Sequence, residues 1–260
     1  MSDEAISRSW ARLREAERKA LIPYVTAGYP TREQSLAALD MVQQSGADLV
    51  ELGIPFSDPL ADGPAIQHSS EVALERGMTV AGAIELAREA SLRVPVILFG
   101  YLNPVLAYGL SRFLDDAEKA RVGGLLLTDL PPGEDPDIEQ TIASSSIPLI
   151  PLVAPTTRDD RLETGLRRAR GFVYLIARLG VTGAPTDVGP EIERMVARVR
   201  AATELPVAVG FGIATGEQAR QAARVADGVV VGSALVRRLG ESLDSARELM
   251  EELRAAIDGF

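Results

Sequence analysis

Eight short apolar runs recur along the chain, each bounded by glycine or proline. They are IPYVTAG from Ile22, DLVELGI from Asp48, VPVILFGY from Val94, GGLLLTDL from Gly123, IPLIPLV from Ile147, FVYLIARLG from Phe172, LPVAVGFG from Leu205 and GVVVGSAL from Gly228. Their apolar residues are continuous rather than alternating, which is typical of strands that are buried on both faces of a parallel sheet. The chain is therefore expected to be an α/β protein.

The segments between these runs have the periodicity of helices. Thr31 and Gln34 have the spacing of a helix N-cap and its third residue, an apolar stripe follows, and Gly46 is placed to end that helix. Eight strand–helix units fill the chain in this way. We predict a single (β/α)8 TIM barrel that forms one domain over residues 1–260, because closure into a barrel leaves no exposed sheet edge.

An open doubly wound sheet is the alternative architecture. Its nucleotide-binding fingerprint would follow the first strand, but the sequence there, VTAGYP, contains no GxGxxG. Gly210, Gly212 and Gly216 come near the seventh strand, which is too late, and their spacing is different. The barrel is favoured.

The first twenty residues, MSDEAISRSWARLREAERKA, predict a solvated amphipathic helix that caps the bottom of the barrel. They are too charged for a secretory signal, and no apolar run reaches the roughly 20 residues that span a bilayer. The formal net charge of −10 would repel a polyanion, so a nucleic-acid partner is not expected. We expect a cytoplasmic protein without membrane contact.

The chain has no cysteine and one histidine, His68. Disulfides and thiolate metal sites are thus impossible, imidazole clusters are excluded, and no metal is expected. His68 is interpreted as a residue at the start of a helix. Catalysis must then depend on carboxylates, hydroxyls and the backbone.

One strand-to-helix connection is unusually long, because an extra stretch at residues 55–77 follows the second strand. In barrels, additions at this end of a strand lie over the active-site mouth. Glu51 ends the strand and Asp62 lies in the loop, where partial desolvation raises a carboxyl pKa and suits it to proton transfer. The alternative is a solvated rim charge at Glu51 and turn residues at Asp58 and Asp62.

Glycine-rich segments end the seventh and eighth strands, with Phe211 and Gly212 in one and Gly232 and Ser233 in the other. The loops at these two places in barrels often bind phosphate through backbone N–H groups. Tight turns that need glycine are the alternative. The loop after the sixth strand, residues 177–190, is rich in glycine, proline and threonine and has the composition of a mobile lid.

The segments IPYVTAGYP, ELGIPFSDPLADGPAIQ, YLNP, TDLP, GVTG, GFGI and VGSA, in this order, resemble the tryptophan synthase alpha subunit family. The resemblance extends from about residue 18 to residue 260, and the ELGIPFSDPLADGP string is highly specific. It implies a retro-aldol cleavage of indole-3-glycerol phosphate to indole and glyceraldehyde 3-phosphate. It also implies a beta-subunit partner that uses pyridoxal phosphate and receives the indole in a complex of two alpha and two beta subunits. No cofactor is expected in this chain.

The resemblance also implies roles for individual residues. Glu51 matches the catalytic glutamate, which protonates indole C3 and takes the proton of the adjacent hydroxyl, and Asp62 matches the aspartate that stabilises positive charge near the indole N–H. The substrate-binding positions are Tyr174, Thr182, Gly183, Phe211, Gly212, Gly232 and Ser233, with Thr182 also placed to hold the aspartate. The positions toward the partner are Pro55, Asp58, Tyr101 and Asn103.

Two departures from the family pattern concern loop closure rather than the reaction. Tyr29 stands where relatives commonly carry aspartate, and Ala177 and Leu179 flank Arg178 where small hydroxyl residues are usual. Two other functions fit the same motifs: a free-standing lyase that releases indole, and a subunit without chemistry that only activates its partner. Turnover measured with and without a beta subunit distinguishes these functions.

Overall fold

Eight parallel strands form the centre of the computed structural model, which describes residues 2–131, 133–167, 169–176, 189–210 and 212–259. The strands are β1 (Ala20–Thr26), β2 (Val50–Gly53), β3 (Val96–Gly100), β4 (Gly124–Leu127), β5 (Leu152–Val153), β6 (Val173–Ile176), β7 (Val207–Gly210) and β8 (Gly228–Val231). Their order in the sheet is β4-β3-β2-β1-β8-β7-β6-β5. Leu125 of β4 forms a parallel bridge to Leu149, just before β5, so the sheet closes into the predicted barrel.

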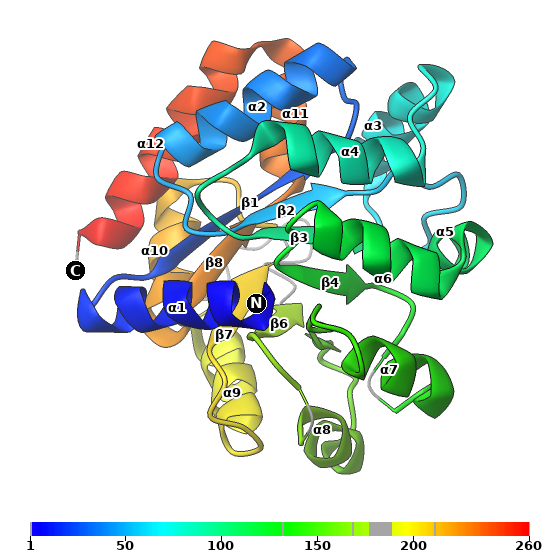
Figure 1. The fold of residues 1–260 in the computed structure, drawn as a ribbon. Coiled ribbons are helices and arrows are strands. Elements are labelled where there is room, and N and C mark those ends of the chain that lie inside the picture. Colours follow the sequence, from blue (N-terminus) through cyan, green and yellow to red (C-terminus); the bar gives the residue numbers. More distant parts are fainter. Residues whose placement is uncertain (1, 132, 168, 177–188, 211, 260) are drawn as a thin grey trace.

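Helices surround this barrel on all sides (Figure 1). They are α1 (Ser2–Glu15), α2 (Arg32–Gln44), α3 (Pro64–Glu75), α4 (Val80–Ala90), α5 (Leu102–Tyr108), α6 (Leu110–Lys119), α7 (Pro136–Ala143), α8 (Asp159–Leu166), α9 (Gly189–Arg200), α10 (Gly216–Val225), α11 (Ser233–Glu241) and α12 (Leu243–Asp258). The predicted cap is present, because Thr31 Oγ1 accepts the N–H of Gln34 at 3.2 Å. No helix in the described ranges is long and apolar enough to cross a membrane.

The long connection after β2 is only partly a loop. Residues 54–63 are irregular, and α3 follows from Pro64, a first-turn position where the missing proline N–H costs nothing. The extended loop predicted after the second strand is therefore a ten-residue loop followed by an additional helix. Its irregular half lies at the carboxyl end of β2, over the mouth of the barrel.

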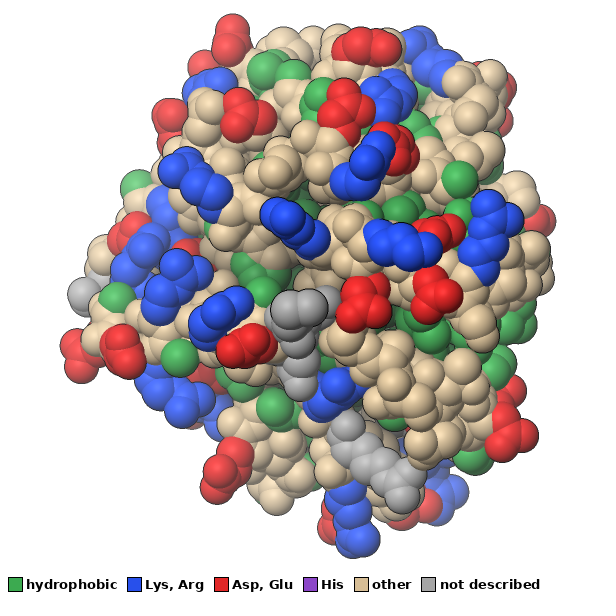
Figure 2. Space-filling model, in the orientation of Figure 1, with side chains coloured by type: hydrophobic (Ala, Val, Ile, Leu, Met, Phe, Trp, Pro, Cys, Tyr) green, Lys and Arg blue, Asp and Glu red, His purple; other side chains and the backbone are tan. Residues whose placement is uncertain are grey.

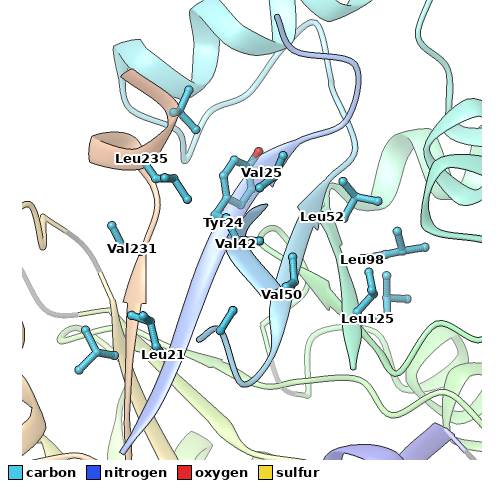
Figure 3. Packing of buried hydrophobic residues seen from close by; sticks show 14 of the residues in the cluster. Leu21, Tyr24, Val25, Val42, Val50, Leu52, Leu98, Leu125, Val231 and Leu235 are labelled. Carbon is cyan, nitrogen blue, oxygen red and sulfur yellow. The ribbon is translucent and has the colours of Figure 1, made fainter. Parts of the chain in front are cut away.

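Buried side chains form two layers because neighbouring residues of a strand point to opposite faces. One layer lies between the strands and the outer helices, and Figure 3 shows part of it, including Val50 and Leu98 of the strands and Val42 of α2. The other layer fills the barrel interior and includes Ile22, Leu49, Ile97, Leu126 and Phe172.

The N-terminal helix closes the amino-terminal end of this interior. Ile6, Trp10 and Leu13 of α1 are buried with the interior layer. The Trp10 ring packs against Phe172 with ring centroids 5.5 Å apart. The capping position was predicted from the sequence, but the helix is solvated on its outer face only.

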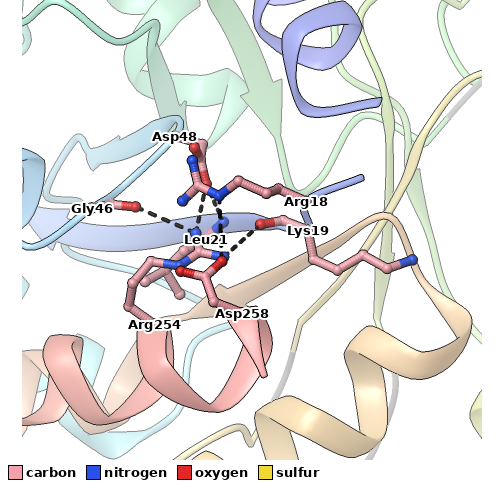
Figure 4. A network of polar contacts seen from close by, with 7 residues as sticks. All are labelled: Arg18, Lys19, Leu21, Gly46, Asp48, Arg254 and Asp258. Carbon is pink, nitrogen blue, oxygen red and sulfur yellow. Dashed lines mark hydrogen bonds and ion pairs between the residues drawn. The ribbon is translucent and has the colours of Figure 1, made fainter. Parts of the chain in front are cut away.

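A buried arginine of the last helix binds the segments that lead into β1 and β2 (Figure 4). Arg254 of α12 is 9% exposed, forms an ion pair with Asp48 at 2.8 Å and donates to the carbonyl of Lys19 at 2.9 Å. Asp48 also accepts the N–H of Leu21 at 3.0 Å. Burial raises the pKa of Asp48, while these two donors oppose the rise. The two ends of the chain are thereby joined at the bottom of the barrel, opposite the mouth.

Candidate active site

Glu51 lies inside the barrel as the second residue of β2, so the strand continues for two residues beyond the end predicted for it. Its strand neighbours in register are Tyr24 of β1 and Ile97 of β3, and its side chain is 1% exposed. Burial raises the pKa of Glu51 to about 8. Its Oε1 atom has no hydrogen-bond partner within the described part of the chain. A carboxyl group that is protonated near neutral pH and has an unused oxygen is suited to give a proton to a bound molecule and take one back.

Asp62 lies in the loop after β2 and is partly buried. Burial raises its pKa to about 6, and a hydrogen bond from Tyr101 opposes the rise. The Tyr101 hydroxyl also accepts the N–H of Ala61 at 3.0 Å. Tyr101, predicted to face a partner, is therefore buried against the loop that carries Asp62, and it holds this loop in place from the end of β3.

Two tyrosines complete the interior side of the mouth. The hydroxyl oxygen of Tyr24 lies 2.0 Å from the position a Cβ would take at Gly53, and that of Tyr174 lies 2.2 Å from the same position at Gly210. Only glycine leaves room for these rings. The negative charges of Glu51 and Asp62 both raise the pKa of each tyrosine, after the larger effect of burial, so all four residues share one site.

Tyr24 was not predicted as a site residue. The available signal was its position two residues after Ile22, a residue of the interior layer, because alternate residues of a strand share a face. Its ring meets Phe99 edge-on, with centroids 5.3 Å apart. Because the pKa of Tyr24 is raised, its hydroxyl stays protonated and can donate a hydrogen bond.

The amino end of α11 lies at the same mouth. Gly232 is its N-cap residue and provides no side-chain acceptor, so the N–H groups of the first turn are available to an anion. A Cβ built on Gly63, in the loop after β2, would lie 3.9 Å from the Ser233 hydroxyl. The predicted phosphate positions Gly232 and Ser233 are thus next to the loop that carries Asp62.

The structure gives less information on the other predicted substrate-binding residues. Gly212 has φ +91°, a left-handed conformation that favours glycine whether or not the loop binds a ligand. Thr182, Gly183 and Phe211 lie outside the described residues, as do Ala177 and Leu179.

A cavity of about 500 Å³ adjoins the Asp62 loop. Apolar side chains and threonines dominate its lining, which includes Ala61, Thr128, Leu152, Val153, Leu162 and Ile176. The volume is in the usual range for small-molecule sites, about 300–1,000 Å³. Arg158 and Arg161 are the charged residues of this lining.

The residues predicted to face a partner are not equally accessible. Asp58 and Asn103 are exposed, whereas Pro55 and Tyr101 are buried. Leu60, which was not predicted, is 97% exposed beside Asp58, and Leu106 of α5 is 45% exposed. These two leucines are the exposed large apolar side chains of the described residues, so this edge of the mouth is its most apolar accessible part.

The fold is that of a TIM barrel, and two carboxyl groups whose pKa values are raised by burial lie together at its mouth. Residues 10–260 match the family model described as the tryptophan synthase alpha chain. The chain belongs to the tryptophan synthase alpha chain family, as the sequence motifs indicated. It is a lyase of tryptophan biosynthesis that cleaves indole-3-glycerol phosphate.

Individual relatives agree with this assignment. The chain is 49% identical to the tryptophan synthase alpha chain of Gluconacetobacter diazotrophicus over 92% of its own length and 89% of the relative. It is similar to the crystal structure of the Legionella pneumophila alpha subunit, with a TM-score of 0.90, 34% identity and coverage of 98% and 99% of the two chains. It is also similar to a chain of Mycobacterium tuberculosis tryptophan synthase in its aminoacrylate-bound form, with a TM-score of 0.87, 36% identity and coverage of 97% and 99%.

Proposed function

We propose that Glu51 carries out the proton transfers of this lyase and that Asp62 stabilises the positive charge they create. The protonated Glu51 carboxyl gives its proton to indole C3, and the positive charge that develops at the ring nitrogen is stabilised by the Asp62 carboxylate. The Glu51 carboxylate then takes the proton of the side-chain hydroxyl, the C=O bond forms, and the carbon–carbon bond breaks. Its electron pair restores the indole ring, and Glu51 is again protonated.

The observation that carries this proposal is the buried Glu51 side chain, whose pKa is about 8 and whose Oε1 has no partner in the described residues. An unpaired carboxyl group in this position costs stability, which a role in proton transfer explains. The test is the rate at which Glu51→Gln releases indole from indole-3-glycerol phosphate, and its expected outcome is argued in the Discussion.

The same proposal places the substrate around these carboxyl groups. The phosphate lies at the amino end of α11, near Gly232 and Ser233, and the indole ring lies toward the cavity beside Ala61 and Thr128. This chain holds no cofactor in the proposal, and the cytoplasmic location expected from the sequence stays a prediction.

Gly232→Val should weaken substrate binding. The Cβ position at Gly232 is 3.7 Å from Ile66 and 3.8 Å from Tyr24, which are ordinary contact distances, so there is space for the first carbon. The added methyl groups would instead keep a phosphate away from the α11 amides. We expect a KM for indole-3-glycerol phosphate about tenfold or more above wild type, with a smaller change in kcat.

Gly232→Ala serves as the graded control for this prediction, because it adds one carbon and should raise KM less. Thermal unfolding of both variants checks the fold. An unchanged KM in a folded Gly232→Val protein would move the phosphate site elsewhere.

We further propose that a tryptophan synthase beta subunit binds at the loop after β2 and at α5, in a complex of two alpha and two beta subunits, with pyridoxal phosphate held by the beta subunit. The exposed Leu60 and Leu106 support this surface. Leu60 is two residues from Asp62, and the intervening Ala61 is hydrogen-bonded to Tyr101. A partner that orders this loop would therefore fix Asp62, and the affinities for partner and substrate should be linked reciprocally.

Addition of a beta subunit should accordingly raise lyase turnover by about fivefold or more. The Leu106→Ser variant should need a higher beta-subunit concentration to reach the same lyase turnover, because it lacks an apolar contact with the partner. Thermal unfolding of Leu106→Ser checks that the loss of this exposed side chain leaves the fold intact. If the isolated chain already turns over as fast as any mixture, the free-standing lyase is the better description.

A further inference from the structure

A second groove lies at the opposite end of the barrel from Glu51. It has a volume of about 490 Å³ and runs between α1 and the segments that lead into β3 and β4. Its charged lining consists of Arg8, Arg12, Arg93, Arg121 and Glu15. Figure 2 looks onto this end of the molecule and shows Lys and Arg side chains along and beside α1. Four arginines thus line one groove in a chain that has 27 basic and 37 acidic residues.

The four guanidinium groups have almost no partners in the described part of the chain. Arg12 donates to the hydroxyl of Ser9 at 3.2 Å. The Arg93 backbone N–H donates to Gln43 Oε1, but the side chains of Arg8, Arg93 and Arg121 form no hydrogen bond or ion pair with another described residue. Arg88, close by on α4, is by contrast paired with Glu85. The groove therefore carries four guanidinium groups against one carboxylate, that of Glu15.

The backbone at Arg121 supports a role for its side chain. This residue follows α6 with φ +61°, a left-handed conformation usually taken by glycine or asparagine at the end of a helix. An arginine there costs about 1–2 kcal/mol of backbone strain. The cost is understandable if the guanidinium group is needed at the groove.

The lining between the arginines is apolar. Leu92 and Val94 are half-buried and Pro95 is buried, and together with Ala5 and Ala11 they provide surface for an uncharged group. Guanidinium groups bind phosphate oxygens in paired hydrogen bonds, and they keep their charge at any physiological pH. At physiological salt the negative field of the whole chain is screened over about 8 Å, so the local arginines dominate.

We propose that this groove binds a small organic polyphosphate, with its phosphate groups on the arginines and its organic part on the apolar lining. The groove lies at the amino ends of β3 and β4, whereas Asp62 and Tyr101 lie at the carboxyl ends of the strands. The groove is therefore a site separate from the lyase site. The proposal does not depend on the roles given to Glu51 and Asp62.

Adenosine triphosphate and inorganic tripolyphosphate are suitable probes for calorimetric titration of the full chain at low and at physiological salt. Arg93→Gln combined with Arg121→Gln should weaken adenosine triphosphate binding about tenfold or more, because it removes two of the four phosphate donors. Arg220→Gln combined with Arg224→Gln on α10 removes the same charge outside the groove and should leave the affinity nearly unchanged. Added salt should weaken the binding, and the ligand should raise Tm in the wild type.

Several results would overturn the proposal: no binding by the wild type, equal loss in both double variants, or no loss in the groove variant. If tripolyphosphate binds as tightly as adenosine triphosphate, the apolar lining does not contribute to binding, and that part of the proposal is wrong. Gly232→Val, altered at α11, should bind the nucleotide as the wild type does. If it does not, the nucleotide occupies the lyase site and the groove is not the binding site.

Discussion

Glu51→Gln should lower lyase turnover about 100- to 10,000-fold while the protein stays folded, because general acid–base groups typically contribute this much. The amide has nearly the same volume as the carboxyl group but neither gives nor takes the proton. Oε1 has no hydrogen-bond partner in the described residues, so no bond at that atom is lost there. Indole release from indole-3-glycerol phosphate measures the effect. Turnover near that of the wild type would remove Glu51 from the mechanism.

The same variant should be more stable than the wild type at neutral and alkaline pH. The pKa of Glu51 is raised to about 8 in the folded protein, so the folded state binds this proton more tightly than the unfolded chain does. Stability from this group is then fully present below the ordinary glutamate pKa of about 4.3 and is lost as pH rises through about 8. We expect the Tm of the wild type to fall more than that of Glu51→Gln between pH 5 and about 8.

Glu251→Gln, on the exposed face of α12, is a matched control for this stability effect. It makes the same chemical change at a solvated position, so its Tm should follow that of the wild type over the whole pH range. An identical pH dependence of Tm in wild type and Glu51→Gln would show that the pKa of Glu51 is not raised in the folded protein. A variant that is less active but more stable would show that the buried carboxyl group serves activity at a cost in stability.

The strands were predictable because a parallel barrel buries both faces of each strand and so requires continuous apolar runs. The residues at which the strands begin and end depend on contacts with distant residues, which the apolar runs do not reveal. The second apolar run begins at Asp48, but β2 begins at Val50, because the Asp48 side chain turns to Leu21 and Arg254 instead. The fifth run begins at Ile147, yet β5 is only Leu152–Val153. Pro148 and Pro151 interrupt that run, since proline has no N–H for the ladder.

The site was predictable only where a residue type and a strand end coincide. Glu51 satisfies the first condition, but it lies two residues before the end of β2 rather than at it. Tyr24 depends on the register that places Gly53 beside Thr26, and nothing in the local sequence gives the register between two strands. Tyr101 depends on a loop that brings Ala61 to it across forty residues. The sequence suggests an interface there, and the structure shows a hydrogen bond to the loop of the second carboxyl group.

The pH profile of the reaction should be bell-shaped. Glu51 must begin as the acid and Asp62 as the anion, so kcat/KM should fall above about 8, the pKa of Glu51, and below about 6, the pKa of Asp62.

Asp62→Asn should lose about 100-fold or more of the turnover, because a neutral amide does not stabilise the cationic ring. An active Asp62→Asn protein would show that the charge is not needed.

Tyr101→Phe tests how the protein tunes Asp62. The Tyr101 hydroxyl lowers the pKa of Asp62 against the effect of burial, so its removal should raise that pKa and move the acid limb of the profile to higher pH. The loss of activity should then be larger at pH 6 than at pH 7.5. Loss of the acceptor for the Ala61 N–H would also loosen the loop, but that effect lowers kcat equally at every pH. Tyr108→Phe, which removes a tyrosine–aspartate hydrogen bond to Asp116 on the outer surface, should leave both limbs in place. If the acid limb stays at its wild-type pH in Tyr101→Phe, burial alone sets the pKa of Asp62, and Tyr101 serves the loop rather than the charge.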